Sequence, residues 1–205
     1  MKGKISFYSY ITASLSLIVP LPGRLAYGIV ALILLNFLML FGTFFRKLIQ
    51  VLDLLDLQPV LLPVFLMFLT ILFKQFLIIY SPIMALSMGF LIYMPAVSSF
   101  LIGCLYDKST EKIKTDLYFN MKESLIFSFF ALLIFLFRDI FGFGTLSFPG
   151  KFKLIEVIIT NYNPEKTYIG VFWASIPGAL VITALGVVFI THFLDKSEEV
   201  KNDTL

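Results

Sequence analysis

"SLIFSFFALLIFLFRDIFGFGTLSFPG", residues 124–150, joins an apolar run to a charged pair and a glycine-rich exit. A mainly apolar run of roughly 20 residues is long enough for a helix to cross the hydrocarbon core of a bilayer. Arg138 and Asp139 come near the end of this run, and Gly142 and Gly144 follow at once. The stretch therefore predicts a membrane-spanning helix that ends at a polar boundary.

The composition of the whole chain places it in the membrane class. Of its 205 residues, 59% are hydrophobic and 14% are charged, and the mean hydropathy is +0.95. Soluble domains carry about 25% charged residues. The net charge of +3 is too small to suggest nucleic-acid binding. We therefore expect an all-α integral membrane protein, with residues 1–205 forming a single membrane domain and residues 196–205 a short polar cytoplasmic tail.

Six apolar runs, separated by charged or Pro/Gly-rich joints, predict six transmembrane segments. The first run could be taken for a secretory signal, but no small-residue cleavage site follows it, so we expect it to be retained. The joint at 46–59 has leucines at helical spacing and predicts an amphipathic stretch at the membrane surface. The predicted segments lie near 4–19, 25–45, 60–80, 82–105, 124–143 and 168–194.

The distribution of basic residues predicts the orientation. If all six segments cross, ten of the 16 Lys and Arg residues lie on the side that holds the N-terminus, the 46–59 joint, the 106–123 loop and the C-terminal tail. Loops rich in Lys and Arg stay in the cytoplasm. Both termini are therefore expected to be cytoplasmic.

Two of the six runs look defective as simple spans. The first stops at Pro20, short of the roughly 20 residues that a full crossing needs. The fourth contains Gly89, Pro95 and the pair Ser98 and Ser99. Weak spans in equivalent places of two halves are typical of an inverted three-plus-three repeat, in which half-helices meet near the membrane midplane. We therefore expect such a repeat, with broken first and fourth segments.

Arg138 and Asp139 are neighbours, so on a helix they point about 100° apart and each needs a partner elsewhere. One interpretation places both at the outer end of the fifth helix, where long side chains reach water at little cost. The other makes them buried charges with a functional role. Gly142 and Gly144 would permit a tight exit from the helix, with Thr145 binding freed backbone groups.

Three further polar residues lie within or beside apolar runs. Lys74 is deep in the third run, where a charge is costly unless it is paired or reaches water. It either forms a salt bridge or hydrated path, or snorkels to the interface, and the sequence leaves both open. Asn36 is expected to hydrogen-bond between helices. His192 is expected to be an interfacial histidine near the end of the last run.

No sequence pattern points to a catalytic site. The sequence has no HExxH, Walker A, GxSxG or GxGxxG motif. Cys104 is the only cysteine, which excludes an internal disulfide and an all-cysteine metal site built from this chain alone. We therefore assign no catalytic and no metal-binding residue, and whether the chain takes part in an enzyme is left open.

Two motifs nevertheless resemble a known family. The stretch "FLFRDIFGFGTLSF" at 135–148, followed by "IPGALVITALGVVFITHFLD" at 176–195, resembles membrane subunits of the Rnf and Na+-translocating NADH:quinone oxidoreductase complexes. Members have six helices, an Arg-Asp/Glu-x-x-Gly-x-Gly-Thr-Leu motif after the fifth and a Pro-Gly-Ala motif in the sixth. The matching residues are Arg138, Asp139, Gly142, Gly144, Thr145, Leu146, Pro177, Gly178 and Ala179.

The resemblance implies a location and partners. Cytoplasmic termini fit the E-type Rnf subunit, equivalent to the D subunit of the Na+-pumping enzyme, better than its oppositely oriented partner. The expected location is the bacterial inner (plasma) membrane. In this family two homologous subunits face each other as an inverted pair within a larger electron-transport complex.

The resemblance also implies a cofactor that this sequence is poorly equipped to hold. In the family, cysteines from the first and fourth half-helices ligate an intramembrane iron–sulfur cluster. The equivalent positions here are Ser16 and Ser99. We therefore expect a divergent subunit that binds no cofactor by itself and keeps only the vestigial cluster positions. The alternatives are a small inverted-repeat transporter and a non-redox assembly subunit.

Overall fold

The computed structural model describes residues 17–98, 101, 104–105, 113–159, 168–186 and 188. Within these residues the chain is mostly helical, and three helices dominate: α2 (Leu25–Val51), α3 (Gln58–Tyr80) and α7 (Ile113–Phe143). By length and composition, each could cross a membrane. These helices suggest a multi-pass membrane protein.

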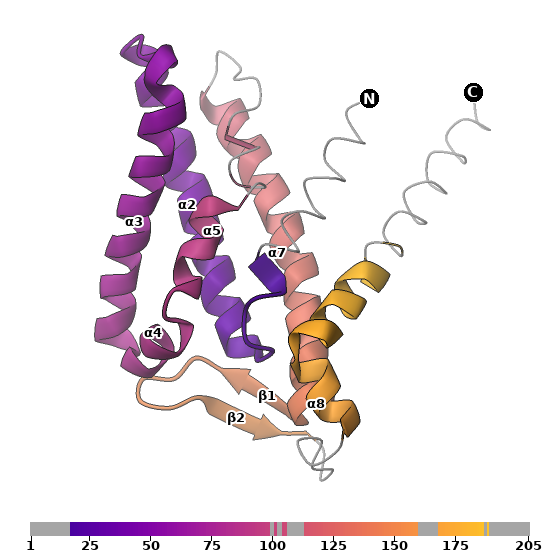
Figure 1. The fold of residues 1–205 in the computed structure, drawn as a ribbon. Coiled ribbons are helices and arrows are strands. Elements are labelled where there is room, and N and C mark those ends of the chain that lie inside the picture. Colours follow the sequence, from indigo (N-terminus) through magenta and orange to yellow (C-terminus); the bar gives the residue numbers. More distant parts are fainter. Residues whose placement is uncertain are drawn as a thin grey trace, which may run out of the picture.

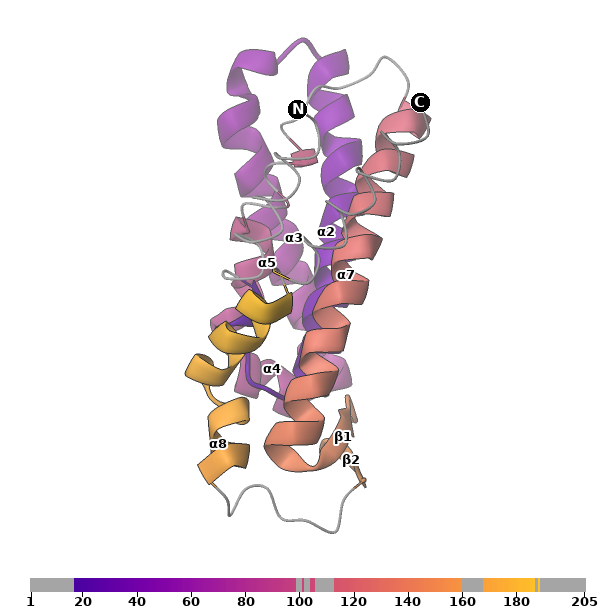
Figure 2. The ribbon, with the colours of Figure 1, turned by 90° about the vertical axis from the view of Figure 1, so that its right-hand side faces the viewer.

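The long helix α2 lies at the centre of the bundle. It packs along α7 on one side and along α3 on the other, as Figures 1 and 2 show. More of α2 is buried than of α3 or α7. Its Leu34, Leu35 and Leu38 are fully buried in the main core. A helix that is apolar all round can be buried on every face, which makes α2 suited to this place.

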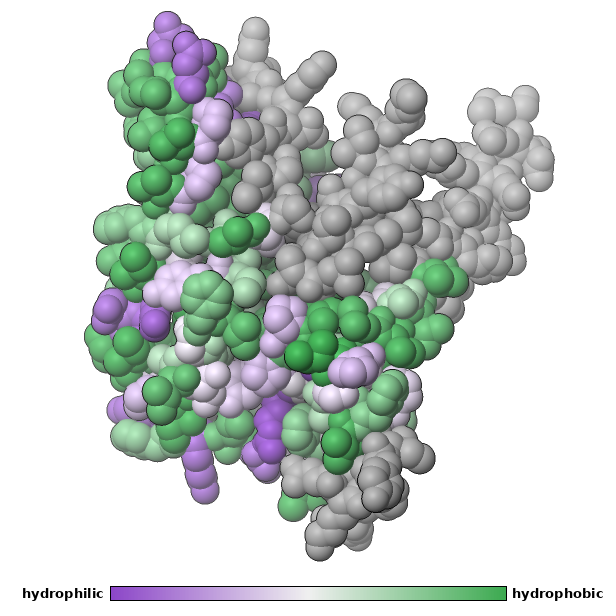
Figure 3. Space-filling view, viewed as in Figure 1, coloured by the Kyte–Doolittle hydropathy of each residue, from purple (hydrophilic) through white to green (hydrophobic). Residues whose placement is uncertain are grey.

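The outer helices present apolar side chains to their surroundings. In Figure 3, hydrophobic residues cover most of the visible surface of α3, and hydrophilic residues gather at the upper end of this helix and near the hairpin. The exposed side chains along α3 include Val64, Phe68, Phe76 and Ile79. Such a surface is stable in lipid but not in water.

The fourth predicted segment is interrupted, as expected from its sequence. It consists of α4 (Pro82–Met88), a 3-10 turn (Leu91–Tyr93) and α5 (Met94–Val97). Gly89 ends α4 with φ +50°, a conformation that a residue with a side chain rarely adopts. After α5, Ser98 is extended, and its hydroxyl accepts a hydrogen bond from the backbone N–H of Leu101.

Within the described residues, this segment packs against α2 through α5 and against α3 through α4 and α5. At its start, Ser81 Oγ donates to the carbonyl of Gly150 at 2.6 Å, in the loop near the N-terminal end of α2. At its far end, the carbonyl of Leu105 accepts from Arg46 near the C-terminal end of α2. The inverted repeat stays a prediction, because the first segment lies mostly outside the described residues.

A two-stranded antiparallel sheet follows α7 and was not predicted. Strand β1 (Thr145–Phe148) pairs with β2 (Ile155–Ile158), so the fold is not entirely helical. The hairpin lies across the ends of α4, α2 and α7 (Figure 1). The Pro149-Gly150 dipeptide between two short apolar stretches was a turn signal that could have revealed it.

Two predicted boundaries are wrong. The second run does not end near 45: α2 continues to Val51, and the chain then turns at Asp53, whose φ is +55°. The place of the 46–59 stretch at the membrane surface stays a prediction. The fifth helix begins at Ile113 rather than near 124, so part of the predicted 106–123 loop is helical. The two extensions meet at an ion pair between Arg46 of α2 and Asp116 of α7.

Close contact between α2 and α7 requires a glycine. A Cβ atom on Gly28 would lie 2.4 Å from Cδ2 of Phe135, whose ring is fully buried and cannot move aside. We expect Gly28→Ala to lower the free energy of unfolding by about 1–3 kcal/mol, the usual cost of overpacking. Unfolding in detergent micelles, followed by circular dichroism, would measure the loss.

Gly42→Ala is the graded control, because its Cβ would meet the flexible end of Leu105 at 2.7 Å. It should destabilise the protein less than Gly28→Ala. A Gly28→Ala variant as stable as wild type would contradict the close contact between α2 and α7.

Candidate functional site

Arg138 and Asp139 form a buried joint at the end of α7. Their side chains are 1% and 0% exposed, so of the two interpretations the one that places them in water at the helix end is wrong, and both are buried. The two side chains turn to different neighbours, as their 100° separation on the helix requires. Each of the two side chains is held by atoms of other elements.

Asp139 binds the N-terminal end of α2. Its Oδ2 accepts hydrogen bonds from the backbone N–H of Leu25 at 3.1 Å, the N–H of Ser147 at 2.7 Å and the hydroxyl of Ser147 at 2.6 Å. Arg24, the N-cap residue of α2, gives no side-chain cap. A carboxylate that satisfies the first N–H groups of a helix also complements the positive end of the helix dipole. Asp139 is therefore the cap of α2, supplied by α7.

The hairpin completes this cap. Ser147, on β1, accepts a hydrogen bond from the N–H of Ala26 at 3.2 Å while donating to Asp139. Thr145 donates its hydroxyl to Asp139 Oδ1 at 3.3 Å. Thr145 was expected to bind freed backbone groups, but its hydroxyl binds this carboxylate instead. β1 is thereby fixed to both long helices.

Arg138 binds backbone carbonyls where other elements end. Its Nη1 donates to the carbonyls of Ile18 at 3.0 Å and Leu21 at 3.1 Å, and its Nη2 donates to the carbonyl of Ala174 at 3.2 Å. Ala174 is the last residue of α8 (Tyr168–Ala174). Carbonyls at a helix end lack intrahelical partners and carry the negative end of the dipole. Arg138 supplies the missing donors.

Small residues let the backbone come close to this arginine. A Cβ on Gly23 would lie 3.0 Å from the Ala174 carbonyl oxygen and 3.3 Å from Nε of Arg138. A Cβ on Gly142 would lie 3.1 Å from the backbone of Ala174. Gly142 was expected to ease the exit from the helix, but it is helical and its role here is close packing. Within the described residues, Arg138 Nε has no hydrogen-bond partner.

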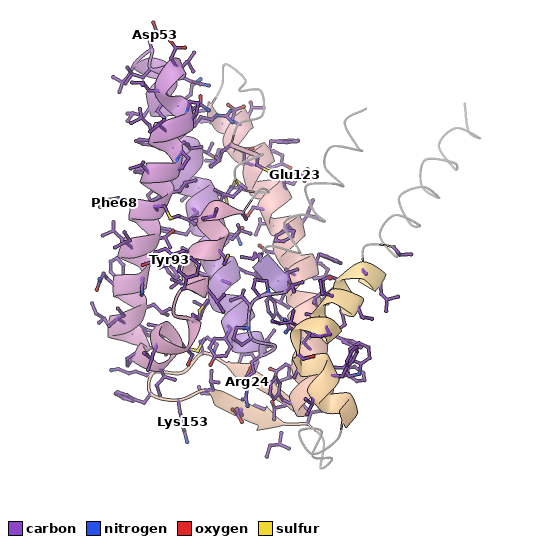
Figure 4. The ribbon with its side chains drawn as sticks, viewed as in Figure 1. Arg24, Asp53, Phe68, Tyr93, Glu123 and Lys153 are labelled. Carbon is purple, nitrogen blue, oxygen red and sulfur yellow. The ribbon has the colours of Figure 1, made fainter. Side chains whose placement is uncertain are left out.

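The exit from α7 is made by Gly144. It has φ +69°, and its N–H donates to the carbonyl of Ile140 at 2.9 Å. A glycine in this conformation just after a helix is a common helix stop. Arg24, at the entry to α2, pairs with Glu156 of β2 and lies over the ring of Phe143 at 4.5 Å. Figure 4 shows Arg24 between the hairpin and the helix ends.

The predicted sixth run is interrupted at Ser175, just before Pro177 and Gly178. α8 ends at Ala174, Ser175 interrupts the helix, and a second helix covers Ile176–Gly186. A Cβ on Gly178 would lie 2.1 Å from the carbonyl oxygen of Phe172, so only glycine fits there. Pro177 cannot donate to a helix ladder, which favours a break at this place. The expectation of one continuous run over 168–194 is wrong within 168–186.

A polar seam joins α2 to α7 away from the joint. Asn36 donates to Ser128 Oγ and accepts from Ser124 Oγ, each at 2.8 Å, which are the interhelical bonds expected of it. One turn further along, Asn120 donates to Thr43 Oγ1 at 3.1 Å. Such bonds hold helices together where lipid offers no hydrophobic driving force.

The seam ends in an ion pair that the sequence did not reveal. Arg46 and Asp116 are 3.2 Å apart, and their side chains are 4% and 8% exposed. Arg46 also donates to the carbonyl of Leu105 at 2.9 Å. It was predicted to lie in a surface stretch, and Asp116 in a loop. The sequence did place opposite charges near the ends of two predicted helices. It did not show that these two helices are neighbours.

Lys74 is not part of the joint or the seam. It is half-buried, and its Nζ lies 5.2 Å from the centre of the Tyr93 ring, in the fourth segment. Ser16, Ser99 and His192 lie outside the described residues. Cys104, the single cysteine of the chain, is half-buried. In the described part of the chain, no three His, Cys, Asp or Glu side chains form a group that could hold a metal ion.

No family model and no curated protein matches this sequence.

Proposed function

We propose that this chain is a membrane subunit of an Rnf-type ion-translocating electron-transport complex of the bacterial plasma membrane. In this proposal it has six spans arranged as an inverted repeat, with both termini in the cytoplasm. It packs against a paired homologous subunit and holds no intramembrane iron–sulfur cluster of its own. Two motifs support the proposal through their resemblance to that family. They are Arg138 to Leu146 and Pro177 to Ala179.

The interrupted fourth segment is the observation that carries the proposal. The extended Ser98 lies one residue before Ser99, the position at which the resemblance implies a cluster ligand. An interruption of this kind in a membrane segment leaves backbone groups free to line a site. The break thus falls at the place in the chain where the family-like arrangement needs it.

The ligand chemistry supports a subunit without a cluster. Iron–sulfur clusters are held by thiolates, whereas serine offers a hydroxyl that stays protonated. Cys104 is a poor substitute, because its backbone carbonyl lies 3.5 Å from Arg46, near the C-terminal end of α2. A cysteine there is close to the end of the bundle rather than to the break after α5. The proposal therefore gives Ser16 and Ser99 no redox role.

The geometry makes Arg138 and Asp139 part of the scaffold. Both side chains are occupied by backbone groups of other elements, which leaves neither of them available for a moving ion. In this proposal their role is to hold together the ends of α2, α7 and α8. Electrons and ions are handled by the partner subunits or at the interface with them.

Isolation with companion chains tests the proposal. The full chain, tagged and extracted in a mild detergent, should copurify with a homologous membrane subunit and with flavin-carrying subunits, identified by mass spectrometry. The chain alone should contain no acid-labile sulfide and show no iron–sulfur absorption, and Cys104→Ala should change neither result. Stoichiometric iron that Cys104→Ala removes would refute the absence of a cluster.

The same experiment separates the alternative function. The interrupted segment would also suit a small transporter, since half-helices often bind solutes. A chain that is isolated without any redox partner, and whose membrane location is otherwise normal, would favour the transporter and contradict the proposed complex.

A further inference from the structure

Lys74 and an apolar groove lie on the same side of α3. The groove is lined by Pro63, Val64, Met67, Phe68 and Ile71 and has a volume of about 420 Å³. Pro63, Met67 and Lys74 are spaced by four and seven residues, which places them in one row along a helix. Lys74 is therefore at the edge of the groove face, at the end nearer to the hairpin.

The charge of Lys74 has no partner of opposite sign in the described residues. No salt bridge involves it in that part of the chain, and its ammonium group lies over the ring of Tyr93. The aromatic ring stabilises the ammonium group only in part. A lysine among apolar residues is stable when it is paired or reaches the interface. An anion from outside this chain would complete its surroundings.

The depth of Lys74 suits a lipid headgroup. It is six residues before Tyr80, the last residue of α3, which is about 9 Å along the helix at 1.5 Å per residue. The flexible stem of lysine lets its ammonium group extend towards the interface. Tyr93 covers one side of Lys74, and Figure 4 shows this tyrosine between α3 and α5. Tyrosines are common at the level of the headgroups.

Apolar side chains surround the charge where an acyl chain would lie. Ile71 and Ile78, on the same part of α3, are 46% and 42% exposed. Phe90 is 72% exposed, and its ring centre lies 6.0 Å from that of Tyr93. From Lys74 the groove leads away from the helix end, towards the middle of α3. A cation near the interface followed by an apolar groove directed inward matches the head and tail of a phospholipid.

We propose that this surface binds an anionic phospholipid, with its headgroup at Lys74 and Tyr93 and one acyl chain in the groove from Ile71 to Pro63. The site is independent of the proposed electron-transport function. It would belong to the leaflet on the hairpin side of the bundle.

Lipid retention measures this binding directly. The full chain is reconstituted in nanodiscs of mixed phosphatidylglycerol and phosphatidylcholine, released into detergent and examined by native mass spectrometry. Wild type should retain phosphatidylglycerol in preference to phosphatidylcholine. Lys74→Met should lower this retention about fivefold, the size expected for one lysine beside an anionic headgroup. Lys122→Met, which removes an exposed lysine from α7, is the matched control and should retain as much as wild type.

Two further variants separate the headgroup from the groove. Lys74→Arg should restore retention, and Met67→Trp should reduce it by filling the groove while leaving the charge in place. Equal retention by Lys74→Met and Lys122→Met would overturn the proposal. So would release of a bound protein by Lys74→Met with unchanged lipid, because Lys74 would then pair with a partner chain. Wild type without headgroup preference would also overturn it, even if the variants failed to fold.

Discussion

Asp139→Ala is expected to lower the free energy of unfolding by about 2–4 kcal/mol, the combined size expected for a lost helix cap and for buried donors left unsatisfied. The carboxylate receives hydrogen bonds from Leu25, Ser147 and Thr145, all from elements other than α7. Alanine leaves these donors buried and unsatisfied, and it leaves the N-terminal end of α2 without a cap. Thermal unfolding in detergent micelles, followed by circular dichroism, measures the effect.

Two controls make this result specific. Asp56→Ala removes a carboxylate from an exposed position between α2 and α3 and should change stability little. Asp139→Asn keeps one side-chain oxygen and should lose less than Asp139→Ala. If Asp139→Ala and Asp56→Ala unfolded at the same temperature, Asp139 would not be the cap of α2.

Arg138→Met should cost about 2–4 kcal/mol and should loosen α8 from α7. Methionine fills much of the same volume, but the carbonyls of Ile18, Leu21 and Ala174 would lose their donors. The substitution leaves these backbone carbonyls in place, so each of them stays buried without a hydrogen-bond donor, which destabilises the fold. The loss therefore differs from replacement of a whole ion pair, which is often neutral.

The single tryptophan reports on this change. Trp173 precedes Ala174, and its ring lies edge-on to Phe137 of α7 with centres 5.8 Å apart. In Arg138→Met its fluorescence should shift as α8 moves away from α7. Lys153→Met, a change at an exposed lysine of the hairpin, should leave the spectrum unchanged. An unaltered spectrum in Arg138→Met would show that the arginine does not hold α8.

Local patterns predicted the features whose cause lies within a few residues. The broken fourth segment followed from Gly89 and Pro95, because a glycine and a proline limit a helix wherever they stand. The stop after α7 followed from Gly144 for the same reason. The need of Arg138 and Asp139 for separate partners followed from helix geometry alone.

Features that depend on distant neighbours could not be predicted from one sequence. The depth of Arg138 is set by carbonyls from two remote parts of the chain, and hydropathy gives no sign of them. Arg46 was assigned to the 46–59 surface stretch and Asp116 to the 106–123 loop, because the predicted helices ended before the one and began after the other. Only the packing of α2 on α7 shows that the two charges meet. The apolar groove on α3 could likewise be found only once the exposed face of this helix was known.

The cap on α2 has a consequence for how the protein is made. Ribosomes release the N-terminal part of a chain first, so α2 enters the bilayer before residue 139 has been synthesised. Until then the leading N–H groups of this early helix have neither Asp139 nor Ser147 to bind. The earliest of the three long helices can settle into its final position only when the last of them has arrived.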